Sequence, residues 1–281
     1  MRLRALLFVP GDRPERFAKA AASGADALIL DLEDSVSAAN KAAARDAIAT
    51  WLSAPRTITT FVRINPLDSG PLDSNMAQAD LDAVLAARPD GIMLPKAEGA
   101  DSVRHLLTLM GDKAVPILPI ASETAAAVFT LGTYRDVSAH LAGLTWGAED
   151  LPAAIGAATS READGSYTDP YRMVRSLTLF GAHAAGVAAI ETVFPNIKDL
   201  DALSAYAARG RRDGFTGMMA IHPAQVPIIN TAFTPSEADL VHARAIVAAF
   251  EANPGAGALQ LDGKMIDAPH LKQAMAVLAG V

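Results

Sequence analysis

Eight short runs of apolar residues alternate with stretches of helical periodicity along this 281-residue chain. This alternation predicts a parallel sheet, because each parallel connection must cross back over the sheet, usually through a helix. The predicted strands cover residues 4–9, 27–32, 59–64, 91–95, 115–120, 141–146, 187–193 and 217–221. The predicted helices between them cover residues 14–23, 41–52, 78–87, 100–110, 122–131, 170–185 and 200–211.

The strand runs are apolar on both faces, which is typical of strands buried between a barrel interior and a shell of helices. Eight strand–helix units in about 225 residues predict an α/β fold, the (β/α)₈ TIM barrel. A doubly wound open sheet is the alternative. Its common G-x-G-x-x-G dinucleotide-binding motif is missing after the first strand, which favours the barrel.

The barrel is predicted to occupy residues 1–235 as the catalytic domain. Residues 236–281 are predicted to form a C-terminal helical extension, with helices at 236–252 and 269–278 and Ser236 as N-cap of the first. The polar, glycine-containing segment 159–169 is predicted to be a long loop at one rim of the barrel.

Charge and cysteine content exclude several classes of function. The chain has 24 Lys and Arg against 31 Asp and Glu, a net charge of −7, so no nucleic-acid partner is expected. It has no cysteine, which excludes disulfides and thiolate metal sites and fits the reducing cytoplasm, the location that we expect. The opening apolar run breaks at Pro10-Gly11, so neither a secretion signal nor a membrane span is expected.

Polar residues follow the predicted strands at their carboxyl ends, where TIM barrels carry their chemistry. They are Asp12 and Arg13, Asp31, Glu33 and Asp34, Arg63 and Asn65, Lys96, Glu123, Glu149 and Asp150, Glu191, and His222. Because the carboxyl ends of barrel strands share one rim, these side chains are expected to surround one site.

Glu123 and Asp150 follow the fifth and sixth predicted strands, so they are expected to converge. Two converging carboxylates repel each other unless they share a proton or a cation. Mg²⁺ is commonly held by one or two carboxylates together with water and substrate, so the pair predicts a magnesium site. The alternative is structural: each carboxylate caps the helix that follows it.

Arg63 ends an otherwise apolar strand, where a guanidinium requires an anionic partner. We expect it to bind a substrate carboxylate, to form an ion pair with Glu33, or to do both. Asp31 and Glu33 lie two residues apart on one strand face, so either is a candidate to orient Arg63 or to hold a water bound to the metal. The alternative for both Asp31 and Glu33 is a rim ion-pair network with Arg63 and Lys96, in which Lys96 stays protonated.

A basic cluster of Arg13, Arg16 and Lys19 lies at the first strand–helix junction. It is either a site for a nucleotide-like phosphate or an ordinary solvated helix face. The histidines show no metal-ligand spacing, and none of them is assigned a role.

The motifs resemble, in order and over nearly the whole chain, the citrate lyase β-subunit family, which includes malyl-CoA and citramalyl-CoA lyases and related hydroxy-oxoacid aldolases. The segments that carry the resemblance are LFVPGDRPER at 7–16, LDLED at 30–34, VRIN at 62–65, LPK at 94–96, SET at 122–124, GAEDL at 147–151 and GKMIDAP at 263–269.

The resemblance implies a Mg²⁺-dependent carbon–carbon lyase on a TIM barrel, assembled as a homotrimer. Its partners would be a small oxoacid and a coenzyme A or acyl-carrier thioester. The roles it implies are Glu123 and Asp150 as metal ligands, Arg63 as the contact to the oxoacid, Gly147 and Ala148 as backbone contacts to its carboxylate, and Arg13 and Lys19 near coenzyme A.

The tail segment resembles the part that reaches a neighbouring protomer in CoA-dependent members of the family. Its aspartate, Asp267 here, would act as acid and base, with capping of the last helix as the structural alternative. The expected activity is cleavage or formation of a β-hydroxyacyl thioester such as malyl-CoA, citramalyl-CoA or a citryl thioester, with Arg63, Glu33 and Asp267 as catalytic candidates. The alternatives are a class II oxoacid aldolase that uses a pyruvate enolate and a non-catalytic barrel subunit of a lyase complex.

Overall fold

The computed structural model describes residues 2–67 and 75–279. Residue contacts divide the chain into two compact units, Met1–Asn230 and Thr231–Val281.

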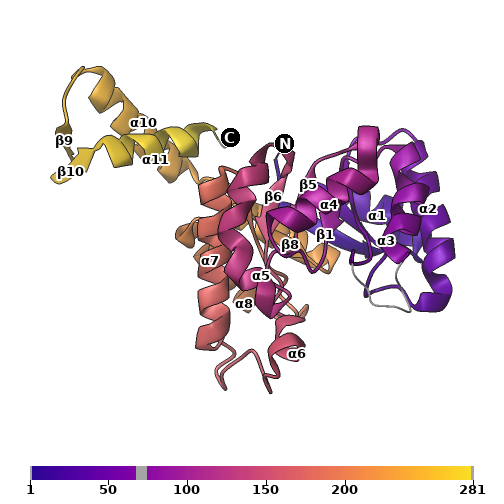
Figure 1. The fold of residues 1–281 in the computed structure, drawn as a ribbon. Helices are drawn as coiled ribbons and strands as arrows, with labels where there is room; N and C mark the ends of the chain where they lie inside the picture. Colours follow the sequence, from indigo (N-terminus) through magenta and orange to yellow (C-terminus); the bar gives the residue numbers. More distant parts are fainter. Residues whose placement is uncertain (1, 68–74, 280–281) are drawn as a thin grey trace. The chain divides into compact units, whose positions relative to one another are not determined.

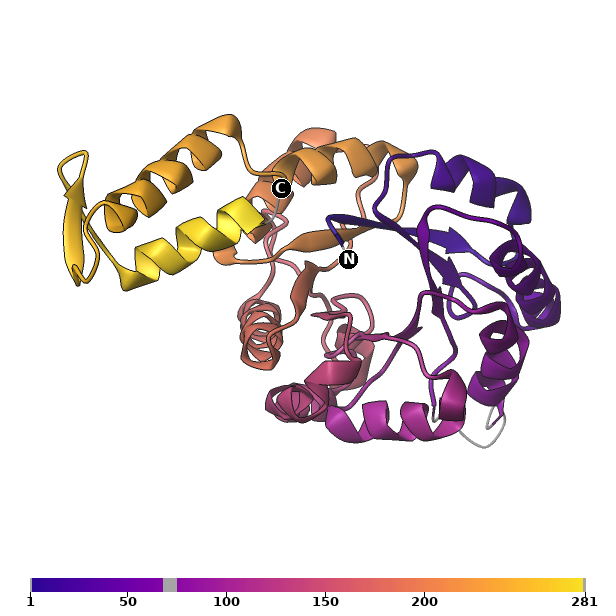
Figure 2. The ribbon, with the colours of Figure 1, turned by 90° about the horizontal axis from the view of Figure 1, so that it is seen from above.

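The first unit contains an eight-stranded parallel sheet in the order β5-β4-β3-β2-β1-β8-β7-β6 (Figures 1 and 2). Parallel bridges from Ile117 to Leu141 and from Ile120 to Thr145 join the two edge strands and nearly close the sheet into a barrel. The strands are β1 Ala5–Pro10, β2 Ala27–Asp31, β3 Thr59–Arg63, β4 Gly91–Leu94, β5 Ile117–Pro119, β6 Gly143–Thr145, β7 Ala188–Glu191 and β8 Gly217–Ala220. The predicted TIM barrel and its eight strands are confirmed.

Helices follow the strands and surround them in Figure 2. The α-helices of this part of the chain are α1 Phe17–Ala21, α2 Lys41–Ser53, α3 Met76–Val84, α4 Ala100–Met110, α5 Ala125–Thr130, α6 Leu151–Ile155, α7 Asp169–Ala185, α8 Leu200–Asp213 and α9 Val226–Ala232. The 3₁₀ segments are η1 Pro14–Arg16, η2 Ala38–Asn40, η3 Leu85–Ala87, η4 Gly111–Lys113, η5 Leu131–His140 and η6 Pro223–Gln225.

Each predicted helix of the barrel has a counterpart, and the differences lie mainly at helix ends. The predicted helix 14–23 begins as the 3₁₀ segment η1, where Pro14 occupies the first position and has no N–H to donate. The predicted helix 122–131 starts only at Ala125, because the Thr124 side chain accepts a hydrogen bond from the Ala127 amide and caps the helix there. The short helices α6 and α9 were not predicted.

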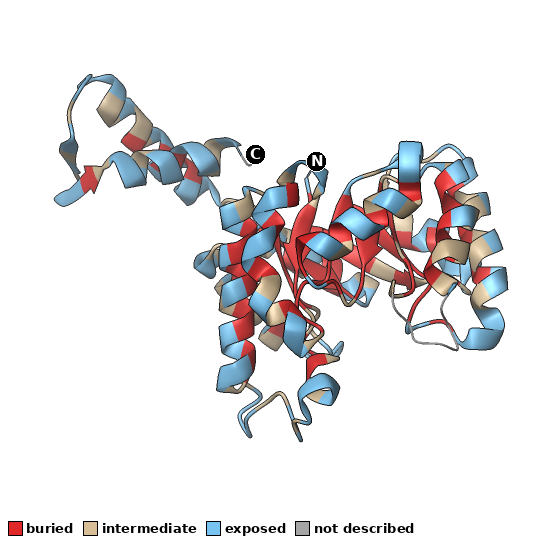
Figure 3. Cartoon of the chain, viewed as in Figure 1, coloured by how far each residue is buried: buried red, intermediate tan, exposed pale blue. Residues whose placement is uncertain are grey.

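Apolar side chains form the core of the barrel. Figure 3 colours the buried residues red, and they gather on the strands and on the helix faces that cover them. The interior cluster is Leu3, Leu6, Ala27, Ile29, Phe61, Met93, Leu118, Ile120, Ile190 and Met219. Gly91 makes room for one of them, because a Cβ there would lie 2.3 Å from the Phe61 ring. Burial on both faces of the strands explains why their sequences are apolar without alternation.

The second unit consists of α10 Glu237–Glu251, a hairpin of β9 Ala258–Leu261 and β10 Lys264–Asp267, and α11 Ala268–Ala279. The two predicted tail helices are confirmed, and Ser236 caps α10 in a capping box with Asp239. The hairpin was not predicted. Asp262 and Gly263 form its turn with φ of +49° and +78°, the conformation that an Asp-Gly pair favours.

No helix among residues 2–67 and 75–279 is long and apolar enough to cross a membrane.

Candidate active site

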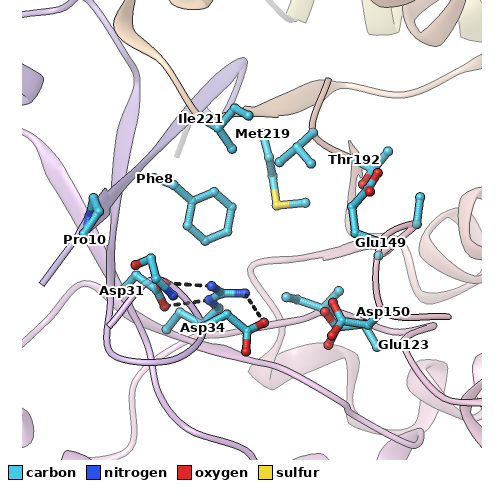
Figure 4. A pocket seen from close by; sticks show the side chains of 16 residues that line it. Phe8, Pro10, Asp31, Asp34, Glu123, Glu149, Asp150, Thr192, Met219 and Ile221 are labelled. Atoms are coloured by element: carbon cyan, nitrogen blue, oxygen red, sulfur yellow. Dashed lines mark hydrogen bonds and ion pairs between the residues drawn. The ribbon is translucent and has the colours of Figure 1, made fainter. Parts of the chain in front are cut away.

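A cavity of about 300 Å³ lies at the carboxyl ends of the barrel strands. Figure 4 shows its apolar side chains, including Phe8 and Met219, opposite the carboxylates of Asp31, Glu123 and Asp150. The lining residues are Phe8, Pro10, Asp31, Asp34, Ser35, Arg63, Ile120, Glu123, Gly147, Ala148, Glu149, Asp150, Thr192, Val193, Met219 and Ile221. Of the predicted site residues, Arg63, Glu123, Gly147, Ala148 and Asp150 therefore line one cavity.

Arg63 is fixed by a bidentate ion pair with Asp31 on the neighbouring strand. The strand register sets the two residues side by side. Nε and Nη2 of Arg63 donate to Oδ1 and Oδ2 of Asp31, each at 2.7 Å. Burial opposes ionisation of Asp31, but the Arg63 guanidinium outweighs it and holds the pKa of Asp31 below its usual value. The carboxylates also raise the pKa of Arg63 against its burial, so the guanidinium is firmly charged.

Glu33 lies between two cations. Its Oε2 is 2.8 Å from Nη1 of Arg63, and its Oε1 accepts a hydrogen bond from Nζ of Lys96 at 2.7 Å. Burial nevertheless raises the pKa of Glu33, because the two cations only partly offset the lost hydration. Asp31 and Glu33 thus both contact Arg63, and the rim network that the sequence left open as an alternative is present.

Glu123 is a buried carboxylate, with 3% of the residue exposed. Its Oε2 accepts a hydrogen bond from the backbone amide of Lys96 at 2.6 Å. Burial raises the pKa of Glu123 to about 8, and the negative charges of Asp150 and Glu33 add to this. It does not cap the following helix, since Thr124 does so.

Asp150 stands at the N-cap position of α6, but its side chain makes no capping hydrogen bond. The side chain is 34% exposed, and its Oδ1 lies 3.7 Å from Nζ of Lys96. The structural alternative of two helix-capping carboxylates therefore does not describe either Glu123 or Asp150.

The chemistry of these oxygens fits a hard divalent cation. The buried Glu123 has a pKa raised partly by Asp150, and a shared cation would relieve that repulsion. Gly147 lies over Glu123, and a Cβ there would be 2.6 Å from its Cγ, so a glycine leaves the carboxylate undisturbed. Within the described ranges no cluster of three or more His, Cys, Asp or Glu side chains is arranged to hold a metal. Two carboxylates with water and substrate are the pattern that suits Mg²⁺.

The sequence interpretation missed the apolar part of the cavity. These residues are Phe8, Ile120, Val193, Met219 and Ile221. They lie in the second halves of β1 and β8 or just beyond β5, β7 and β8, so the signal was their position near the carboxyl ends of the predicted strands. The prediction considered only ionisable residues and therefore did not include these apolar side chains.

Several other predicted residues lie outside the cavity lining. Arg13 has a side chain 55% exposed, with Asp12 at 3.9 Å, and Lys19 is exposed on α1. Asp267 belongs to the second unit, at the end of β10. Glu191 is fully buried and accepts hydrogen bonds from Trp146 Nε1 at 2.6 Å and Arg175 Nε at 2.7 Å, so it joins β6, β7 and α7.

The chain is similar to known proteins over nearly its whole length. The model of the HpcH/HpaI aldolase/citrate lyase family matches residues 4–223. A citrate lyase subunit beta-like protein of Mycobacterium tuberculosis is 41% identical over 278 residues, 97% of this chain and 93% of that protein. The mitochondrial citramalyl-CoA lyase of Mus musculus is 33% identical, over 98% of this chain and 85% of that protein.

A similar solved structure is CitE of Mycobacterium tuberculosis in complex with magnesium, acetoacetate and coenzyme A. It has a TM-score of 0.81 and 38% identity, and the match covers 99% of this chain and 98% of that one. The match of the family model includes every residue that lines the cavity. The chain therefore belongs to the HpcH/HpaI aldolase/citrate lyase family of enzymes.

Proposed function

We propose that this chain is a Mg²⁺-dependent carbon–carbon lyase that cleaves or forms a β-hydroxyacyl-CoA thioester. Malyl-CoA, citramalyl-CoA and a citryl thioester are the candidate substrates, and the products are an oxoacid and an acyl thioester. One observation carries the proposal. A buried carboxylate with a raised pKa, Glu123, shares a cavity with the charged guanidinium of Arg63, so one cavity offers a cation site beside an anion site.

Glu123 and Asp150 would hold the magnesium ion. When bound, the ion would act as a Lewis acid that polarises the oxygen of the hydroxyl or carbonyl group at the reacting carbon. The CitE relative whose structure contains magnesium, acetoacetate and coenzyme A supports this assignment.

Arg63 would bind the carboxylate of the oxoacid. Asp31 holds two of its nitrogens and Glu33 faces the third, so the guanidinium cannot rotate away from the cavity. It lies 5.0 Å from the Phe8 ring centroid, which adds a cation–π contact. Glu33 in this scheme orients Arg63 and Lys96. The backbone around Gly147 and Ala148, which also line the cavity, would complete the carboxylate site.

The coenzyme A portion would lie toward Arg13 and Lys19. Both are exposed cations at the junction of β1 and α1. Exposed cations in this position can bind phosphate groups at the protein surface. This suits coenzyme A, a large ligand that would remain partly in solvent.

Asp267 would move the proton that the carbon–carbon bond cleavage requires. In cleavage the substrate hydroxyl gives its proton to solvent and becomes the carbonyl of the oxoacid. The departing thioester carbon gains a proton from the Asp267 carboxyl, and in condensation the same group removes it. We propose that Asp267 acts at the site of a neighbouring protomer in a homotrimer, which the resemblance of the tail supports.

The proposal is tested with full-length protein, Mg²⁺ and malyl-, citramalyl- and citryl-CoA, with separate assays for oxoacid, acyl-CoA and free thiol. We expect one thioester to yield oxoacid and acyl-CoA in equal amounts, and EDTA to abolish the reaction. Free thiol without oxoacid would indicate hydrolysis instead. Cleavage of a hydroxy-oxoacid without coenzyme A would indicate a class II aldolase, and no turnover at all would indicate a non-catalytic subunit.

A further inference from the structure

The carboxylate of Asp267 is in direct contact with a histidine to which the sequence assigned no role. Oδ1 of Asp267 lies 2.5 Å from Nδ1 of His270, which is a hydrogen-bonding distance. The backbone amide of Asp267 donates to the same Nδ1 at 3.2 Å. One ring nitrogen of His270 therefore faces both the carboxylate and the amide of a single residue.

The second unit fixes the main chain on both sides of this pair. Asp267 is the last residue of β10 and pairs with Ala258 across the hairpin. Its neighbour Ile266 is 3% exposed and packs against Ala243, Ile246 and Ala274. His270 follows within the first turn of α11, which begins at Ala268. The contact thus joins two anchored elements, and neither residue belongs to a free loop.

The pair is accessible to water. The side chains of Asp267 and His270 are 33% and 44% exposed. An imidazole has two nitrogens on opposite sides of the ring, so a proton taken up at Nε2 is accompanied by release of one from Nδ1. Such a ring can pass protons between solvent and the carboxylate that its Nδ1 contacts.

We infer that His270 is the proton partner of Asp267, a positioning residue that orients the carboxyl group and renews its proton. The inference rests on the acid–base role of Asp267 in the proposed function. In cleavage, Asp267 gives its proton to the thioester carbon and becomes a carboxylate. While Asp267 is protonated, Nδ1 accepts from it and the ring carries its proton on Nε2. After the transfer, exchange with water moves the ring proton from Nε2 to Nδ1; Nδ1–H then protonates the carboxylate while Nε2 takes a proton from water, so the pair returns to its starting state after each turnover. Condensation runs the same transfers in reverse.

A purely structural role for His270 is the alternative. Acceptance of the Asp267 amide by a side chain three residues later is half of a capping box, in which Glu or Gln commonly stands at this place. The side-chain oxygen of Gln can accept the same hydrogen bond. The Gln amide cannot take up a proton at one atom and release one from another, as an imidazole can. His270→Gln therefore separates capping from proton transfer, whereas His270→Ala removes both. His242 is exposed on α10, and His242→Gln is the matched control.

The experiment uses the full-length Mg²⁺-loaded enzyme and whichever of malyl-, citramalyl- and citryl-CoA turns over fastest. Exchange of the methyl protons of acetyl-CoA with D₂O is measured in parallel. For His270→Gln we expect kcat and the exchange rate to fall together, by about a hundredfold, with KM within twofold and an unchanged melting temperature. His270→Ala should lose the same activity and also melt earlier. His242→Gln should match the unsubstituted protein.

Two outcomes would overturn the inference in different ways. If Asp267→Ala abolishes turnover while His270→Gln keeps a normal kcat and exchange rate, His270 is only a cap and the proposed function stands. If Asp267→Ala itself turns over normally, the proposed role of Asp267 is wrong and the inference falls with it.

Discussion

The backbone amide of Lys96 donates a hydrogen bond to Oε2 of Glu123 at 2.6 Å, and Lys96 adopts a left-handed φ of +50°. This conformation costs a non-glycine residue about 1 kcal/mol or more, so the surroundings must hold it. The ammonium group of the same residue contacts Glu33 at 2.7 Å and lies 3.7 Å from Asp150. Lys96 therefore connects three acidic side chains around the cavity, one through its backbone and two through its side chain.

Replacement of Glu123 by Gln should remove magnesium binding. The amide keeps the shape of the side chain but cannot supply a charged oxygen, so we expect Mg²⁺ affinity to fall by about a hundredfold or more. The metal-free variant should be at least as stable as the unsubstituted protein, because a buried group no longer has to ionise. Isothermal titration calorimetry measures the affinity. Glu98→Gln, at an exposed position beyond β4, is the control, and equal Mg²⁺ binding by both variants would contradict the site.

Magnesium binding should release a proton at pH 6.5. Burial raises the pKa of Glu123 to about 8, so the free site is mainly protonated there, and the ion must displace that proton. Affinity should rise with pH, by up to about tenfold per unit, and level off above about 8. Calorimetry in two buffers of different ionisation enthalpy counts the protons released. A pH-independent affinity would show that Glu123 is already ionised in the metal-free protein.

The same shift predicts how the stability of the metal-free protein depends on pH. Between about 4.3, the ordinary pKa of Glu, and about 8, the folded chain keeps a proton on Glu123 that the unfolded chain has lost. The folded state binds more protons in this window, so the contribution of Glu123 to the free energy of unfolding is full below it and falls as pH rises through it. Urea unfolding at a series of pH values tests this, and Glu123→Gln should flatten the slope in the same window.

Replacement of Arg63 by Lys should weaken oxoacid binding without loss of the fold. Lysine keeps the positive charge but cannot bind Asp31 and Glu33 with three separate nitrogens and still face a substrate. A hydrogen bond between charged groups contributes about 1.5–3 kcal/mol, so we expect KM for the oxoacid to rise roughly 10- to 100-fold in condensation. Arg104→Lys, an exposed pair with Asp101 on α4, is the control. An unchanged KM would show that Arg63 has only a structural role.

Replacement of Gly147 by Ala should disturb the metal site through sterics alone. The added Cβ would lie 2.6 Å from Cγ of Glu123 and 3.0 Å from its Oε1, so the carboxylate must move. We expect Mg²⁺ affinity to fall by about tenfold or more, as for other changes in the surroundings of a metal ligand. Gly132→Ala is a matched control, because its Cβ would meet nothing within 4 Å. If both variants bind Mg²⁺ equally, Glu123 is free to adjust and Gly147 is not needed to place it.

The local pattern of the sequence was sufficient for the barrel. Each apolar run became a strand within a few residues of the predicted limits, because burial on both faces and the crossover helices leave one architecture for eight such units. The hairpin of β9 and β10 was missed although its Asp262-Gly263 turn is a known signal. Its strands are short and mostly exposed, so they lack a clear apolar pattern.

The sequence by itself determined which side chains end the strands, and therefore that Arg63, Glu123 and Asp150 share one rim. Only the tertiary structure decided which groups each of these charged side chains contacts and how far each is buried. Strand register sets Asp31 beside Arg63, the left-handed turn at Lys96 directs its amide to Glu123, and packing buries Glu123 to 3% exposure. These outcomes depend on distances between segments far apart in the chain and on the loss of solvent around them. Neither the distances nor the solvent exposure can be obtained from the order of the residues, because both are set only when the barrel has formed.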